Sequence, residues 1–131
     1  MTTVLAVDLG SASGRVLAGT LTDGRLEVTD IHRFKHQARR REDGTLTWDV
    51  ATMEAETING LMKALEQFPD ACAVSIDTWG VDWAPLDEDG RLVGDVIAYR
   101  DERTSRTLDA FRERIADREF FDLTGNQPAT I

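Results

Sequence analysis

A short turn rich in glycine and serine follows the first apolar run of the sequence, in the stretch "VLAVDLGSASGRVLAG". Its glycines permit positive φ angles, and the small residues between them leave backbone N–H groups uncovered. Successive N–H groups in a tight turn bind anions, and an arginine offers a charged fork that matches phosphate oxygens. The turn therefore predicts a phosphate-binding loop made of Gly10, Ser11, Ala12, Ser13, Gly14 and Arg15. A plain hairpin turn is the alternative interpretation.

An aspartate, Asp8, stands at the end of the apolar run, directly before this turn. A carboxylate beside a buried strand is costly without a partner, and a hydrated magnesium ion on a nucleotide would be one. In the alternative, Asp8 accepts hydrogen bonds from the N–H groups of the turn itself. The turn is not a Walker loop, because it has no Gly-Lys-Ser/Thr and the residues after it favour a strand.

A second acidic strand end lies in "SIDTWGVD", residues 75–82. Asp77 follows an apolar run as Asp8 does, so the two carboxylates are expected at one crevice, where the carboxyl ends of strands bind ligands. Gly80 lets the backbone approach a ligand closely, and Trp79 and Trp83 are flat apolar walls of the kind that stack on sugar rings. The alternative makes both tryptophans core residues and Asp82 a turn acid; for Trp83, this segment taken alone favours the core.

The elements that must position these residues are predicted from spacing. Residues 3–8, 15–21 and 26–34 alternate as strands, and Asp23-Gly24 is a hairpin signal, so three antiparallel strands form a meander. From Asp49, a plausible N-cap, apolar residues recur every three or four positions until Pro69, which predicts a helix.

Residues 71–77 contain an apolar run that predicts a strand covered on both faces, which after a helical crossover joins the meander in a mixed sheet. Residues 81–94 predict an inserted hairpin around Asp89-Gly90. A second amphipathic helix is marked by Leu108, Phe111 and Ile115, and a short helical turn is closed by Gly125.

Composition limits the possible partners. The 131 residues suit one domain, and 24 acidic against 15 basic residues give a net charge of -9, which disfavours nucleic acid and anionic lipid. No apolar run reaches the roughly 20 residues of a membrane helix and no signal sequence is evident, so a cytoplasmic protein is expected. The lone cysteine, Cys72, is predicted to be a small core residue. The polar C-terminal segment suggests a chain that has been cut short.

Five segments together resemble the N-terminal part of the FGGY carbohydrate kinases: "AVDLGSASGRV", "IHRF", "TWDV", "SIDTWGVDW" and "AYRDERT". The resemblance covers nearly the whole chain. "DLGSASGR" alone indicates only the wider group of actin-like ATPases, whereas "IDTWGVD" followed by "YRDERT" at this spacing is much more specific.

The resemblance implies an α/β fold with a ribonuclease-H-like mixed sheet of the actin-like ATPase superfamily. It also implies one of two domains that close around ATP, Mg²⁺ and a ketose, with L-rhamnulose the expected sugar. By this resemblance, residues 10–15 line the phosphates, Asp8 lies near magnesium through water, and Gly80 and Asp82 contact the sugar. Trp79, Asp101 and Arg103 are further sugar-site candidates, although Arg103 could instead pair with Asp101 or Glu102 on the helix surface.

Family members are several times longer than this chain, and their catalytic aspartate and adenosine pocket lie in the later part. The resemblance therefore predicts no catalytic residue in residues 1–131, which should be inactive without the remaining part of the kinase. Two alternatives stay open: a nuclease using Asp8 and Asp77 as ligands of two metals, and a non-catalytic sugar-binding or interaction module on the same scaffold.

Overall fold

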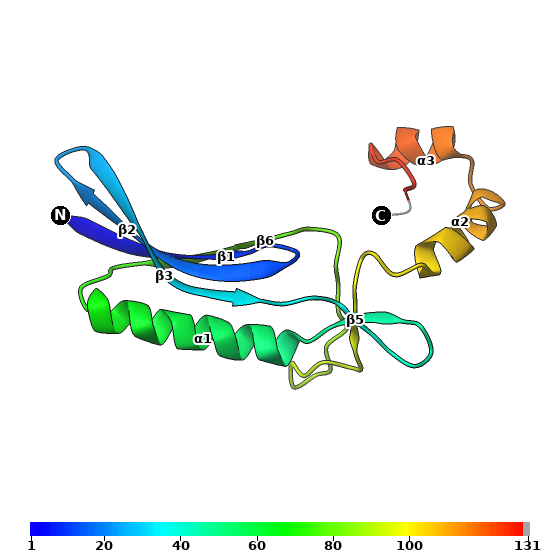
Figure 1. The fold of residues 1–131 in the computed structure, drawn as a ribbon. Helices are drawn as coiled ribbons and strands as arrows, with labels where there is room; N and C mark the ends of the chain where they lie inside the picture. Colours follow the sequence, from blue (N-terminus) through cyan, green and yellow to red (C-terminus); the bar gives the residue numbers. More distant parts are fainter. Residues whose placement is uncertain (130–131) are drawn as a thin grey trace.

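The computed structural model describes residues 1–129 and contains a four-stranded mixed sheet in the order β3-β2-β1-β6 (Figure 1). β1 (Thr2–Leu9), β2 (Ser13–Thr22) and β3 (Arg25–Lys35) form the expected antiparallel meander, and β6 (Val74–Thr78) joins β1 in parallel. Both the meander and the mixed sheet are confirmed.

A long helix, α1 (Val50–Gln67), packs along one face of the meander (Figure 1). It begins where predicted, because the carboxylate of Asp49 accepts the backbone N–H of Thr52 at 3.0 Å. Alternate residues of β1 and β2 supply the core beneath it, where Leu5, Val7, Val16, Ala18 and Ala64 are buried. Gly60 allows this close approach, since a Cβ there would lie 2.5 Å from Cγ2 of Val16.

The prediction that residues 71–77 form a strand covered on both faces is wrong. All five residues of β6 are exposed, Val74 and Ile76 by more than half. β6 is the edge strand of the sheet, and α1 packs over β1, β2 and β3 instead. Cys72 is likewise exposed and not a core residue, because it lies on the connection into this edge strand.

A second, smaller sheet lies beyond the first and has the order β4-β5-β7. β4 (Arg39–Arg40), β5 (Leu46–Trp48) and β7 (Val96–Ile97) are antiparallel, and Trp48, Val96 and Ala98 form their buried cluster. This sheet holds the segment that carries the predicted sugar-side residues.

The inserted hairpin at residues 81–94 is reduced to one antiparallel bridge, Leu86 to Leu92. The turn at Asp89-Gly90 forms, with Gly90 at a φ of 77°. Pairing does not extend because the carboxylate of Asp87 takes the N–H groups of Asp89 and Arg91, and Pro85 has no N–H to give.

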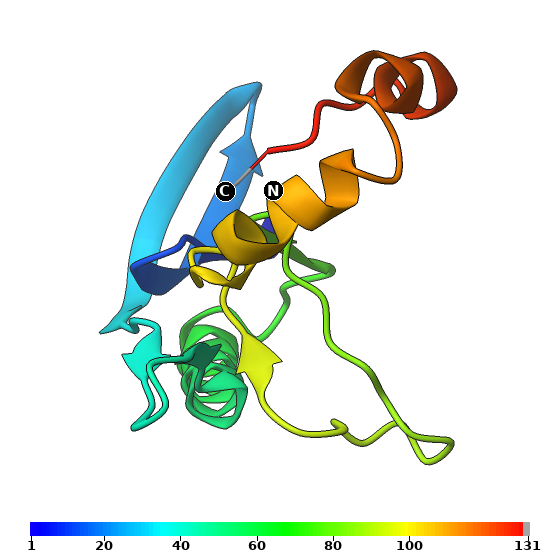
Figure 2. The same cartoon turned by 90° about the vertical axis from the view of Figure 1, so that its right-hand side faces the viewer.

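Two further helices, α2 (Arg103–Arg112) and α3 (Asp117–Thr124), lie beyond the end of the four-stranded sheet (Figures 1 and 2). Both are confirmed, as is the left-handed cap at Gly125, although Ile115 falls after the end of α2. The rings of Phe111 and Phe120 pack edge to face, with their centroids 5.2 Å apart. No helix within residues 1–129 is long and apolar enough to cross a bilayer.

Candidate functional site

Four charged residues form a row across the main sheet, one from each strand. The parallel register sets Asp77 of β6 opposite Asp8 of β1, and the antiparallel registers set Asp8 opposite Arg15 of β2 and Arg15 opposite Arg33 of β3. The two carboxylates therefore meet at one strand end, as the sequence predicted. Arg33 was missed, because an arginine in a strand gives no signal of its own.

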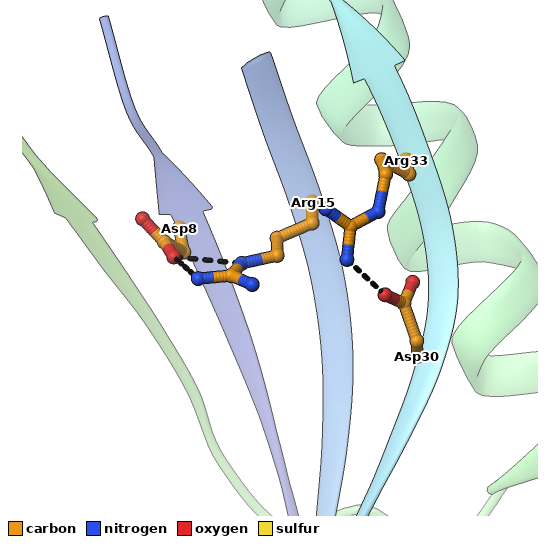
Figure 3. Close-up of polar contacts among 4 residues, drawn as sticks. All are labelled: Asp8, Arg15, Asp30 and Arg33. Carbon is orange, nitrogen blue, oxygen red and sulfur yellow. Dashed lines mark hydrogen bonds and ion pairs between the residues drawn. The ribbon is translucent and has the colours of Figure 1, made fainter.

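Three members of the row, Asp8, Arg15 and Arg33, are drawn in Figure 3 and lie on the face of the sheet that α1 does not cover. Neighbouring residues of a strand point to opposite faces, so Asp8 and Arg15 point away from the buried Val7 and Val16. Two acids on β6 and β1 are followed by two bases on β2 and β3, and each of the two arginines pairs with an aspartate on this surface. Such a surface can meet a cation and an anion side by side.

Asp8 and Arg15 form an ion pair in which Nε and Nη2 of the guanidinium donate to one carboxylate oxygen at 2.8 and 2.5 Å (Figure 3). Arg33 pairs similarly with Asp30 of its own strand, at 2.6 Å. Both pairs are partly exposed, so each is worth at most about 1 kcal/mol. The ion pair can therefore open at small cost in free energy, which leaves Arg15 able to bind a phosphate and Asp8 able to bind a hydrated cation.

The turn between β1 and β2 offers two uncovered amides. Its closing bond runs from the Gly10 N–H to the Ser13 carbonyl at 2.9 Å, and the Ala12 carbonyl accepts the backbone N–H of His36 at 3.3 Å. Within residues 1–129, the N–H groups of Ser11 and Ala12 have no hydrogen-bond acceptor, and both residues are exposed. In the same part of the chain, no N–H group of the turn donates a hydrogen bond to Asp8. The alternative in which the turn amides are the partners of Asp8 is therefore not supported.

Gly10 and Gly14 do not use the positive φ angles that glycine permits, since neither residue is in the left-handed region. Gly14 is required for space: an added Cβ would lie 2.2 Å from Cζ of Phe34, which packs against this residue. At Gly10 a Cβ would approach the Ser13 carbonyl oxygen to 3.3 Å. These glycines allow close packing of the turn and not an unusual backbone.

In the segment predicted to contact the sugar, the carboxylate of Asp82 holds two tryptophans. One oxygen accepts the indole N–H of Trp48 at 2.6 Å and also that of Trp79. The two indole rings lie 4.9 Å apart, and Trp79 packs against the buried cluster around Trp48. Asp82 is therefore more than a turn acid, because it fixes the aromatic wall beside it.

Trp83 is 69% exposed, so its interpretation as a core residue is wrong. Between the tryptophans, Gly80 is exposed and a Cβ there would meet nothing within 4 Å. Val81 has a φ of 73°, a rare conformation for a β-branched residue. Strained backbone of this kind clusters at functional sites, and it could not be predicted from the sequence, because valine normally adopts an extended conformation.

Asp82 and Arg103 both line a cavity of about 220 Å³, together with Val81, Trp83, Ala98, Tyr99, Thr104 and Ala129. In the part of the chain that the structure describes, Arg103 forms no ion pair, so the alternative of a pair with Asp101 or Glu102 does not occur there. The structure therefore brings two of the predicted sugar-side residues, Asp82 and Arg103, to the wall of one hollow.

Asp101 is 6% exposed and accepts two backbone N–H groups, from Leu46 at 2.8 Å and from Arg103 at 2.9 Å. These hydrogen bonds, the one from Leu46 first, lower the pKa of the Asp101 carboxyl below its ordinary value. Asp101 thus joins β5 to the start of α2, and a direct contact with a sugar stays a prediction.

The charges present fit a hydrated magnesium ion better than a multi-carboxylate metal centre. Magnesium keeps several waters and needs only one or two carboxylates from the protein, which Asp8 and Asp77 can provide. Its other ligands are substrate phosphates. Within residues 1–129, no group of three or more His, Cys, Asp or Glu residues is placed to hold a metal ion. The two-metal nuclease would need such a group, so the described residues lend it no support.

Comparison with known proteins gives a consistent result. The model of the FGGY family of carbohydrate kinases, N-terminal domain, matches residues 3–131. The chain is 37% identical over 122 residues to the rhamnulokinase of Bacillus subtilis (strain 168), covering 93% of this chain and 25% of that protein. It is 40% identical over 125 residues to the rhamnulokinase of Klebsiella pneumoniae (strain 342), covering 94% and 25%. The chain spans about a quarter of the length of these curated relatives.

Solved structures share the fold. A xylulose kinase from Rhodospirillum rubrum has a TM-score of 0.79 at 17% identity, covering 97% of this chain and 26% of that one. A ligand-bound xylulose kinase from Lactobacillus acidophilus has a TM-score of 0.75 at 10% identity, covering 93% and 24%. These likenesses confirm the expected fold class, the ribonuclease-H-like sheet of the actin-like ATPases.

Proposed function

Since this chain belongs to the FGGY family of carbohydrate kinases, we propose that the protein carrying it transfers the γ-phosphoryl group of ATP to a ketose. The ketose is L-rhamnulose and the product its 1-phosphate, a choice supported by the identity of 37 to 40% with rhamnulokinases. The observation that carries the proposal is the row Asp77, Asp8, Arg15 and Arg33, which lies beside two uncovered turn amides.

The positive half of the row binds the phosphates in this proposal. Within residues 1–129 the amides of the exposed residues Ser11 and Ala12 have no acceptor, and the forked guanidinium of Arg15 suits phosphate oxygens. Arg33 adds a second cation on the next strand. The remaining turn residues, Gly10, Ser13 and Gly14, shape the loop.

The negative half holds the cation through its water. Asp8 and Asp77 are side by side at the strand ends and accept hydrogen bonds from metal-bound water. Magnesium, when bound, neutralises charge on the phosphates. Arg15 leaves Asp8 as phosphate and cation arrive, which is feasible because their ion pair is partly exposed.

The sugar is bound by the segment from Trp79 to Arg103. The face of Trp79 stacks on the sugar ring, Gly80 lets the ring approach the backbone, and the hollow between Asp82 and Arg103 takes its hydroxyls. Asp101 keeps the start of α2 in place beside this hollow. The aspartate that receives the hydroxyl proton and the adenosine pocket belong to the remaining part of the intact protein, which is the expected partner of this domain.

A coupled assay of ADP release by the intact protein tests the proposal. L-Rhamnulose should stimulate ADP release, in the presence of Mg²⁺, more than D-xylulose, L-fuculose or glycerol at equal concentrations. Residues 1–131 alone should release none, because phosphoryl transfer needs both halves of the clamp. Sugar-independent ADP release or a preference for another acceptor would contradict the assignment of L-rhamnulose, and sugar binding without any turnover would favour the non-catalytic module.

A further inference from the structure

His36, just after β3, has a buried imidazole without a hydrogen-bond partner among residues 1–129. The residue is 9% exposed, and within residues 1–129 neither ring nitrogen makes a hydrogen bond of good geometry. Burial lowers the pKa of His36, against a smaller opposite effect of the nearby backbone at Gly10 and Ser13. A buried polar ring without partners is costly, so its position calls for an explanation.

The imidazole lies between the two halves of the site. On one side it stacks on Trp79, with ring centroids 5.8 Å apart and an angle of 26°, and meets the edge of Trp48 at 5.7 Å. On the other side, the backbone N–H of the same residue holds the Ala12 carbonyl of the turn. Trp48 and Trp79 are the tryptophans that Asp82 holds. One residue thus touches both the phosphate turn and the aromatic wall of the sugar site.

We propose that His36 is a positioning residue that couples sugar binding at Trp79 and Asp82 to nucleotide binding at the turn of residues 10–13. This inference rests on the proposed function and adds a route within this domain by which the two substrates reinforce one another. A sugar stacked on Trp79 fixes the indole, and the indole fixes the imidazole ring packed on it. The imidazole belongs to the residue whose backbone N–H donates to the Ala12 carbonyl, so fixing the ring restrains this hydrogen bond and the uncovered amides beside it. Whichever substrate binds first orders this chain of contacts, so the second binds to an already ordered site.

Coupling of this kind is reciprocal and measurable as a ratio of affinities. With the intact protein, titration calorimetry gives the Kd of a non-hydrolysable Mg²⁺–ATP analogue with and without saturating L-rhamnulose, and the Kd of L-rhamnulose with and without the analogue. For the wild-type protein we expect each ligand to tighten the other by about tenfold, within the usual range of allosteric coupling.

His36→Leu and His36→Gln remove the aromatic ring and should bring this ratio to about 1, while each ligand alone binds within about threefold of wild type. His36→Phe keeps the flat ring and should retain most of the coupling, because the ring nitrogens make no hydrogen bond of good geometry with residues 1–129. Thr57→Val is the matched control: it removes another buried polar atom without a partner within residues 1–129, on α1, and should leave the ratio unchanged.

Three results would overturn the inference: a ratio near 1 in wild type, wild-type coupling in whichever ring-deleted variant folds, or an equal loss of both single affinities with the ratio preserved. The last pattern is that of a merely structural residue. These outcomes are separate from failure of the proposed function, in which the wild-type protein would not bind the analogue and the sugar or would not react them.

Discussion

Asp8 and Asp77 stand directly opposite one another where β1 and β6 run side by side in parallel. Neighbouring strands are about 4.8 Å apart, and like charges on facing positions destabilise a sheet. Arg15 offsets the charge of Asp8, but within residues 1–129 no ion pair involves Asp77. The arrangement is therefore short of one positive charge, which the magnesium ion of the proposed function would supply.

Asp8→Asn in the intact protein should lower kcat by about 10- to 100-fold, the usual cost of removing a group that orients metal-bound water. It should also raise the Mg²⁺ concentration needed for half-maximal rate. Initial rates measured across a Mg²⁺ series check both effects. Asp122→Asn is the control, since it also breaks a partly exposed pair with an arginine, but on α3. An unchanged Mg²⁺ requirement in Asp8→Asn would remove Asp8 from the cation site.

Gly80→Ala should separate ligand binding from folding. The new methyl group meets no atom within 4 Å in the structure, and φ at Gly80 is not positive, so the free energy of unfolding should change by less than about 0.5 kcal/mol. If the sugar packs against this residue, the methyl group costs about 1–3 kcal/mol there and raises the KM for the sugar about tenfold or more. Steady-state kinetics and chemical denaturation give the two numbers.

The contrasting variant is Gly14→Ala. Its methyl group would overlap the ring of Phe34, so it should destabilise the fold by about 1–3 kcal/mol. A destabilised Gly80→Ala, or one with an unchanged KM, would contradict the position given to the sugar.

Asp101→Asn should destabilise the protein by about 1–3 kcal/mol near neutral pH, because an amide nitrogen would replace one acceptor oxygen for the N–H groups of Leu46 and Arg103. The pKa of Asp101 is lower in the fold than its ordinary value of 3.8. Its stabilisation is therefore complete above the unfolded value and is lost as the pH falls through the folded one.

Urea unfolding of wild type and variant between pH 7 and about pH 3 should thus show a difference that shrinks on the acid side. Asp109→Asn on α2 is the matched control, because this exposed carboxylate accepts no hydrogen bond within residues 1–129. A difference that stays constant with pH would show that the Asp101 carboxylate does not carry the effect.

Local chemistry decided which features the sequence could predict. The meander and α1 follow from alternation, from the turn at Asp23-Gly24 and from the N-cap Asp49, all of which act within a few residues. The position of Asp8 beside Asp77 on the neighbouring strand was predicted because each acid ends an apolar run. Such signals act over a few residues, so they do not depend on contacts with distant parts of the chain.

The failures have a different origin. Apolar character indicates that Val74 and Ile76 favour burial, but it does not say which segment would cover them. A glycine can serve either a positive φ angle or close packing, and at Gly14 it serves close packing against Phe34. The strain at Val81 and the place of His36 depend on contacts between distant segments, which no local pattern contains.

β6 leaves one row of main-chain donors and acceptors unpaired within residues 1–129, and its apolar side chains stand beside that row. Strand edges of this kind recruit further strands, including those of identical molecules. A preparation limited to this polypeptide would self-associate through β6 as it is concentrated, so gel filtration at several dilutions should come before any titration of it. Charged substitutions at Val74 or Ile76 are the first remedy for keeping it monomeric.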